Sequence, residues 1–227
     1  AHRFSPARDY FSSAIDIEGD TLVVGAYSED SDQTSITNGT GTSSNNGLAD
    51  SGAVYIYRRS GDTWTQEAYI KSPTGDAYDR FGTVVSLSGD LLAVGAKDGD
   101  NSDGGINHAT DGWINGNWNH SSILDNSLSD TGSVYIFKRT GTSWAQEAYI
   151  TANNMSANDQ FGQNLILDND TLVIRARSED SNQRTISSGT NTSHDNSNSN
   201  SGAIYVYRRT GTSWAQEAYI KASNNDA

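Results

Sequence analysis

The chain of 227 residues contains no cysteine, two prolines and one methionine. Without cysteine it can form no disulfide, no thiolate zinc site, no iron–sulfur cluster and no cysteine nucleophile. Its apolar runs reach only about half a dozen residues, too few to span a bilayer. Basic residues are also scarce, with 15 Lys and Arg against 28 Asp and Glu and a net charge of −13. This charge disfavours nucleic acid or an anionic membrane as the main partner, and leaves cations, neutral polar ligands and basic protein surfaces.

Three copies of one unit make up most of the chain. An Asp-x-Phe sequence begins at Asp9, Asp79 and Asp159, at spacings of 70 and 80 residues. Each unit continues with two apolar runs separated by Gly-Asp or Asn-Asp, then a Tyr-containing run, then a Trp followed by Gln-Glu-Ala-Tyr-Ile. A repeat of this length indicates a repeat architecture. We therefore expect one repeat domain over residues 1–227, with units at approximately 9–78, 79–158 and 159–227.

The composition of the units predicts β-structure. Their apolar runs are rich in Val, Ile, Tyr and Trp, their short turns suit tight hairpins, and no segment has a convincing helical period. Both faces of the predicted strands are apolar, so each sheet must be covered on both sides. The sequence predicts an all-β fold of three four-stranded antiparallel β-propeller blades, with a stacked β-solenoid as the alternative. The recurring Trp64, Trp144 and Trp214 are predicted to pack in the core.

Three blades are too few for a closed ring, because propellers generally have four to eight. Two open blade faces would remain, and surfaces of that size are rarely exposed on a soluble monomer. Two interpretations follow. The chain forms a homo-oligomer, most simply a dimer that closes a six-bladed ring, or it packs against neighbouring repeats of a longer array.

Two dipeptides in the middle unit carry a family resemblance. Phe81-Gly82 at the start of the first strand and Gly95-Ala96 after the second resemble the FG-GAP repeat, the blade of integrin α-subunit propellers and of many bacterial surface proteins. The resemblance implies an extracellular or cell-surface location, adhesion and ligand binding, often with calcium. The other units depart from the pattern at Phe11-Ser12 and Arg175-Ala176.

The calcium position of the integrin-type repeat is not carried over. In that type, calcium occupies an Asp-rich loop between the first two strands. Here the connections are the two-residue turns Gly19-Asp20, Gly89-Asp90 and Asn169-Asp170. Such a turn cannot wrap a cation that takes six to eight oxygen ligands. The chain therefore resembles a bacterial-type variant with short turns.

Long polar segments connect the second and third strands of each unit, at residues 27–50, 97–130 and 177–200. Loops longer than about 12–15 residues within a compact repeat are usually functional or disordered. Connections of the same type emerge on the same face of a propeller. We therefore expect the three loops to form one rim.

Acidic residues near the start of each loop are candidate calcium ligands, because calcium binds hard oxygen atoms on a flexible, Gly-rich backbone. The alternative is that these acids are solvated, or cap turns by accepting hydrogen bonds from backbone N–H groups. The predicted ligands are Asp98, Asp100 and Asp103 in the middle loop, Glu29, Asp30 and Asp32 in the first, and Glu179 and Asp180 in the third.

The middle loop also holds two tryptophans without counterparts in the other loops. An indole in a polar loop can stack on the apolar face of a sugar while neighbouring polar groups bind its hydroxyls; alternatively, the indoles anchor the loop to the blade. The predicted ligand-binding residues are Trp113, Trp118, Asn115, Asn117 and His120.

Motifs for nucleophilic, zinc-dependent or phosphate-transfer chemistry are absent from the sequence, so we do not expect an enzyme. We expect an extracellular ligand-binding or adhesion module with a calcium-ordered rim, whose partner is a glycan or a cell-surface protein, with no nucleic-acid binding and no membrane insertion. The first alternative is a structural building block of a surface assembly or filament. A propeller hydrolase or lyase is the less favoured one.

Overall fold

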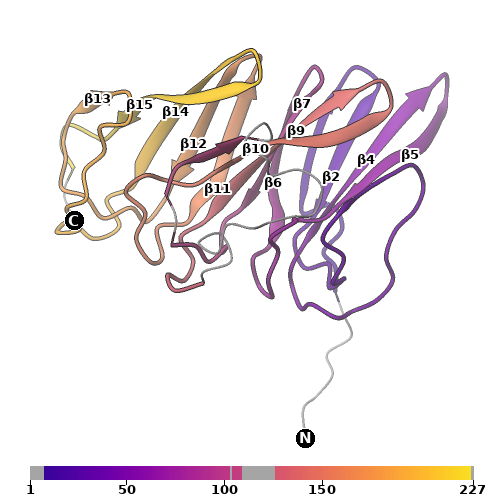
Figure 1. The fold of residues 1–227 in the computed structure, drawn as a ribbon, viewed down its shortest axis with the longest axis horizontal. Helices are drawn as coiled ribbons and strands as arrows, with labels where there is room; N and C mark the ends of the chain where they lie inside the picture. Colours follow the sequence, from indigo (N-terminus) through magenta and orange to yellow (C-terminus); the bar gives the residue numbers. More distant parts are fainter. Residues whose placement is uncertain (1–7, 103, 109–125, 226–227) are drawn as a thin grey trace, which may run out of the picture.

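The computed structural model describes residues 8–102, 104–108 and 126–225. Three sheets stand side by side in chain order (Figure 1). The first contains β1 (Ala14–Glu18), β2 (Thr21–Ala26), β3 (Ile36–Asn38), β4 (Ala53–Ser60) and β5 (Thr63–Ile70). The second contains β6 (Phe81–Ser88), β7 (Leu91–Ala96), β8 (Ile106–His108), β9 (Ser133–Thr140) and β10 (Ser143–Ile150). The third contains β11 (Phe161–Asp168), β12 (Thr171–Ala176), β13 (Ile186–Ser188), β14 (Ala203–Thr210) and β15 (Ser213–Ile220).

The same topology repeats in each sheet. The strand order is β1-β2-β4-β5-β3, β6-β7-β9-β10-β8 and β11-β12-β14-β15-β13, and all neighbours are antiparallel. The two tight hairpin turns of each sheet lie at one end, so the long connection between the second and fourth elements lies at the other. The all-β, blade-like prediction is confirmed. All three long loops start from the same end of their sheets.

The number of strands was predicted wrongly. Each sheet has five, because three residues from the middle of each long loop pair with the outer edge of the last long strand. In the first sheet Ile36 pairs with Ile70 and Asn38 with Ala68. Such short segments within polar, Ser- and Thr-rich sequence produce no apolar run, so the pattern gave no signal for them. The long connections are therefore partly β-structure.

Two hydrophobic clusters lie between the sheets, one at each interface. Phe81, Val85 and Leu87 of the second sheet are buried in the first of these clusters, and their equivalents in the third sheet are buried in the second. The equivalent residues of the first sheet, Ile15 and Ile17, are 68% and 57% exposed because no sheet covers that side. Each blade thus buries its first strand against the blade before it.

The recurring tryptophans follow the same rule. Trp144 and Trp214 are each 2% exposed, as predicted for the core. Trp64 is 39% exposed, so the prediction of core packing is wrong for this residue. Its position in the repeat is the same, but its burial depends on a preceding blade. The repeat pattern identified the recurring tryptophan position, but it could not show which of the three copies has no preceding blade.

Candidate functional site: the loop end of the blades

The base of the first loop is held by a buried ion pair. The Lys71 ammonium group donates hydrogen bonds to Glu29 Oε2 at 2.6 Å and to Ser51 Oγ at 2.7 Å. Ser51 in turn donates to the backbone oxygens of Glu29 and Ser31, both at 3.2 Å. Burial lowers the pKa of Lys71, and its hydrogen bond with Glu29 opposes that shift. The start of the loop, its end and the end of β5 are thereby joined.

The third loop repeats this arrangement. Lys221 contacts Glu179 and donates to Ser201 Oγ at 2.6 Å, and Tyr219 donates to Glu179 Oε1 at 2.7 Å. Asn154 of the middle unit also donates to Glu179 Oε1, at 2.9 Å, so this cluster crosses the interface between two blades. The loop base is therefore tied to its own sheet and to the preceding one.

The middle unit replaces both charges together. Gly99 occupies the position of Glu29, and Thr151 that of Lys71. The loop ends are joined there by neutral bonds: Thr131 Oγ1 donates to the Gly99 oxygen at 3.1 Å, and Tyr149 donates to Asn101. Sequence reasoning missed the Glu–Lys pairs. Aligning the three units would have revealed them, because the acid and the base appear and disappear together.

Three of the predicted metal ligands have one common role. Asp30 and Asp100 each accept a hydrogen bond at 2.7 Å through Oδ1, from the backbone N–H groups of Asp50 and Asp130. Asp180 accepts the same bond from Asn200, at 2.6 Å. These aspartates close the loops, which is the turn-capping alternative that the sequence left open.

The remaining described acids also have partners. Asp32 accepts from Asn45 at 2.6 Å, and Asp98 forms ion pairs with Arg80 at 2.7 Å and with Lys97. Across residues 8–102, 104–108 and 126–225, no group of three or more His, Cys, Asp or Glu side chains could hold a metal ion. Asp103, Trp113, Asn115, Asn117, Trp118 and His120 lie outside the described residues. The calcium site stays a prediction.

The calcium position of integrin-type repeats does not fit this chain. In the turn between the first two strands, Asp20 pairs with Arg59 at 2.9 Å, and its equivalent Asp170 pairs with Arg209 at 3.3 Å. A carboxylate paired with a guanidinium in a two-residue turn has neither the charge nor the number of oxygen atoms that calcium requires.

The blades are joined by glutamates that sequence reasoning also missed. Glu67 of β5 accepts two hydrogen bonds at 2.8 Å from Arg139 of the next blade and one at 3.0 Å from the Trp144 indole. Glu147 does the same with Arg209, at 2.7 Å, and with Trp214, at 3.1 Å. We call each Glu–Arg–Trp set a clasp.

The loop strands add a second connection between blades. The backbone N–H of Trp144 donates to Asn38 Oδ1 of β3, and that of Trp214 donates to His108 Nε2 of β8, both at 2.7 Å. The first and second long loops thus bond to the blade after them, and their positions depend on the packing of the blades.

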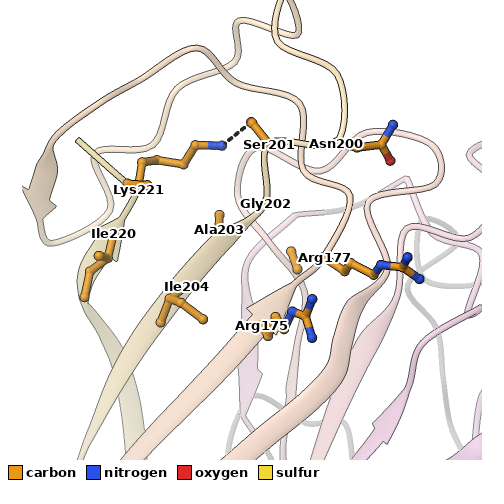
Figure 2. Close-up of a pocket in the computed structure, with 11 residues that line it drawn as sticks. Arg175, Arg177, Asn200, Ser201, Gly202, Ala203, Ile204, Ile220 and Lys221 are labelled. Carbon is orange, nitrogen blue, oxygen red and sulfur yellow. Dashed lines mark hydrogen bonds between the residues drawn. The ribbon is translucent and has the colours of Figure 1, made fainter. Parts of the chain in front are cut away.

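A hollow of about 590 Å³ lies at the loop end of the third sheet, on its outer face. Arg175, Arg177 and Asn200 line it together with Ser201 and Ile204 (Figure 2). In the sequence, Arg175 is visible only as a departure from the repeat pattern, and Arg177 follows two residues later.

The three repeated blades and the clasps between them make this chain a repeat protein built from propeller-like blades. A family model described as the FG-GAP repeat matches residues 6–57, 64–109 and 144–207. The matched segments make up more than half of the sequence, and the chain belongs to the FG-GAP repeat family. No curated protein matches the chain. FG-GAP repeats occur in adhesion-type, integrin-like proteins and are typical of extracellular proteins. Within the described ranges, no helix is long and apolar enough to cross a membrane.

Proposed function

We propose that the chain is an extracellular ligand-binding or adhesion module that binds a glycan or a cell-surface protein at the loop end of its blades. The observation that carries the proposal is that each of the three loops, at one end of the stack, is closed by a hydrogen bond between its fourth and its last residue. Asp30, Asp100 and Asp180 make these bonds. Binding residues are commonly found on loops that a rigid scaffold positions. The proposed activity is binding without catalysis.

In this proposal the loops are ordered mainly by their own buried bonds. Lys71 and Lys221 neutralise the two glutamates that were predicted to bind calcium. Ordering of the middle loop by calcium at Asp98, Asp100 and Asp103 is a separate part of the proposal. A thermal melt with and without chelator tests it: a lower melting temperature with chelator would support calcium, and an unchanged melt would exclude it.

The absence of cysteine allows a direct test of which end binds. Ser199→Cys, on the exposed part of the third loop, and Thr212→Cys, in the hairpin turn at the opposite end of the same sheet, each provide a single thiol for labelling with a large polymer. Unlabelled protein is first screened against immobilised glycans and cell-surface proteins. Polymer at residue 199 is expected to abolish the binding found, whereas polymer at residue 212 leaves it intact. No binding in the screen, or equal loss with both labels, would contradict the proposal.

A further inference from the structure

One close approach between neighbouring blades requires glycine in the second strand. A Cβ atom on Gly25 would lie 2.2 Å from the backbone oxygen of Gly82 in the next blade, and one on Gly95 would lie 2.2 Å from the oxygen of Gly162. Both distances are far below any normal contact between non-bonded atoms. A blade can therefore receive a following blade in this geometry only when its second strand has glycine at this position.

The third blade has Arg175 at this position. A fourth blade packed in the same way would place a backbone oxygen about 2.2 Å from the Arg175 Cβ. The outer face of the third sheet therefore does not accept a blade in the geometry of the two internal interfaces. Arg175 is exposed on that face, and so is Arg177 at the end of the same strand.

The two arginines face a hollow without a partner for their charges. Arg175 is in β12 and Arg177 is the first residue after the end of that strand, and both line the hollow. Within the part of the chain that the structure describes, neither guanidinium forms an ion pair or a hydrogen bond to a side chain. The equivalent residues of the first unit are Gly25 and Tyr27, so this pair of charges is a feature of the third unit alone.

The other lining groups add neutral hydrogen-bonding and apolar surface to these two charges. Asn200 provides an amide, and Ile204 and Ile220 provide apolar surface (Figure 2). The Ser201 hydroxyl is already bonded to Lys221 and to backbone oxygens of the loop. The ammonium group of Lys221 adds no free charge because Glu179 neutralises it. The hollow therefore combines two free cations with neutral hydrogen-bonding groups and apolar surface.

We propose that this hollow binds the anionic group of an acidic polysaccharide, a carboxylate or a sulfate ester, with Arg175 and Arg177 as its charged ligands. This inference rests on the proposed binding function and names the ligand class. A guanidinium matches the paired oxygens of such groups with two parallel hydrogen bonds. Glu179, which contacts the lining residue Lys221, is neutralised by that lysine, and at physiological ionic strength exposed charges beyond about 8 Å are largely screened.

Calorimetric titration of the full chain at physiological salt tests the inference with three probes: oligogalacturonate for carboxylate, sulfated dextran oligosaccharide for sulfate, and neutral dextran oligosaccharide. We expect binding of at least one anionic probe and not of the neutral one, and the two anionic probes distinguish carboxylate from sulfate. Arg175→Gly combined with Arg177→Tyr, the residues of the first unit, is expected to weaken this binding at least tenfold. Arg208→Ala removes an exposed arginine of the same blade outside the hollow, and is expected to change affinity less than twofold.

Three results would overturn the inference. The first is that neither anionic probe binds. The second is that Arg208→Ala weakens binding as much as the double variant, which would indicate attraction by general charge. The third is that a poly-glutamate peptide binds as tightly as the acidic sugars. If the wider screen finds a ligand whose affinity the double variant does not change, the proposed binding function stands and this inference fails. Circular dichroism verifies that the variants remain folded.

Discussion

Replacing Glu147 by alanine tests whether the clasps hold the blades together. The Glu147 side chain is 5% exposed and accepts both Arg209 bonds and the Trp214 indole bond. Its removal leaves a mostly buried guanidinium and an indole N–H without this partner. Breaking a buried ion pair from one side costs about 3–5 kcal/mol. Asp170 remains 3.3 Å from Arg209, so we expect about 3 kcal/mol, at the lower end of that range.

Glu217→Ala is the matched control, because Glu217 occupies the same position in the third blade. No blade follows it in the structure, and among the described residues its ion pair is with Arg208, at 3.4 Å, between side chains that are both about half exposed. Exposed pairs contribute roughly 0–1 kcal/mol. We therefore expect Glu217→Ala to reduce stability by less than about 0.5 kcal/mol.

Urea unfolding measures both variants, with tryptophan fluorescence and circular dichroism recorded on the same samples. Glu147→Ala should move the midpoint to clearly lower urea, whereas Glu217→Ala should leave it almost unchanged. Glu147→Gln, which keeps an acceptor and loses the charge, should fall between the two. Equal midpoints for the two alanine variants would refute the view that Glu147 stabilises the fold through its bonds to the next blade.

Further predictions concern other parts of the fold. Burial raises the pKa of Asp79 to about 8, above an unfolded value of about 3.9, so its contribution to stability is complete below about pH 4 and is lost as the pH rises to 8. Even half of this pKa shift corresponds to about 3 kcal/mol of folding free energy, at 1.4 kcal/mol per pKa unit. Between pH 5 and 8, the melting temperature should therefore fall less in Asp79→Asn than in the parent chain. Lys221→Thr alone should lower the free energy of unfolding in urea by roughly 3 kcal/mol, and adding Glu179→Gly should recover part of that loss. A further loss in the double variant would contradict the view that Glu179 and Lys221 stabilise the fold as a pair. Ser12 occupies the position of Gly82, where a Cβ would lie 2.5 Å from the backbone oxygen of Ala53 in the preceding blade. Ser12→Gly with Arg175→Gly should therefore allow chains to pack end to end, seen in sedimentation velocity as mass above 24.4 kDa that rises with concentration, whereas the parent chain keeps the monomer mass.

The sequence was sufficient to predict the architecture because its signal is repeated three times. Apolar runs of sequence, separated by Gly-Asp turns, were sufficient to locate the long strands, which are covered on both faces. The short edge strands could not be predicted, since segments such as residues 36–38 depend on pairing with residues at least 30 positions away in the sequence. Their formation is a tertiary effect that local pattern does not contain.

The site was predicted less well because acidic residues have several uses. Glu29 and Asp30 are adjacent in sequence and were given the same role, yet one pairs with a buried lysine and the other closes a loop. Sequence spacing does not show which partner a carboxylate meets. The coupled change to Gly99 and Thr151 in the middle unit was the available signal, and it concerns pairs of positions that no motif includes.

The unequal coverage of the three blades sets an order of unfolding. The middle blade shares a clasp on each side, through Glu67 and Glu147, whereas each outer blade shares only one. In a linear array with nearest-neighbour coupling, the units at the ends open first and the central unit opens last. Amide protons of β7 and β9 should therefore exchange most slowly, and the strands that hold Ile15 and Arg175 should exchange well before them.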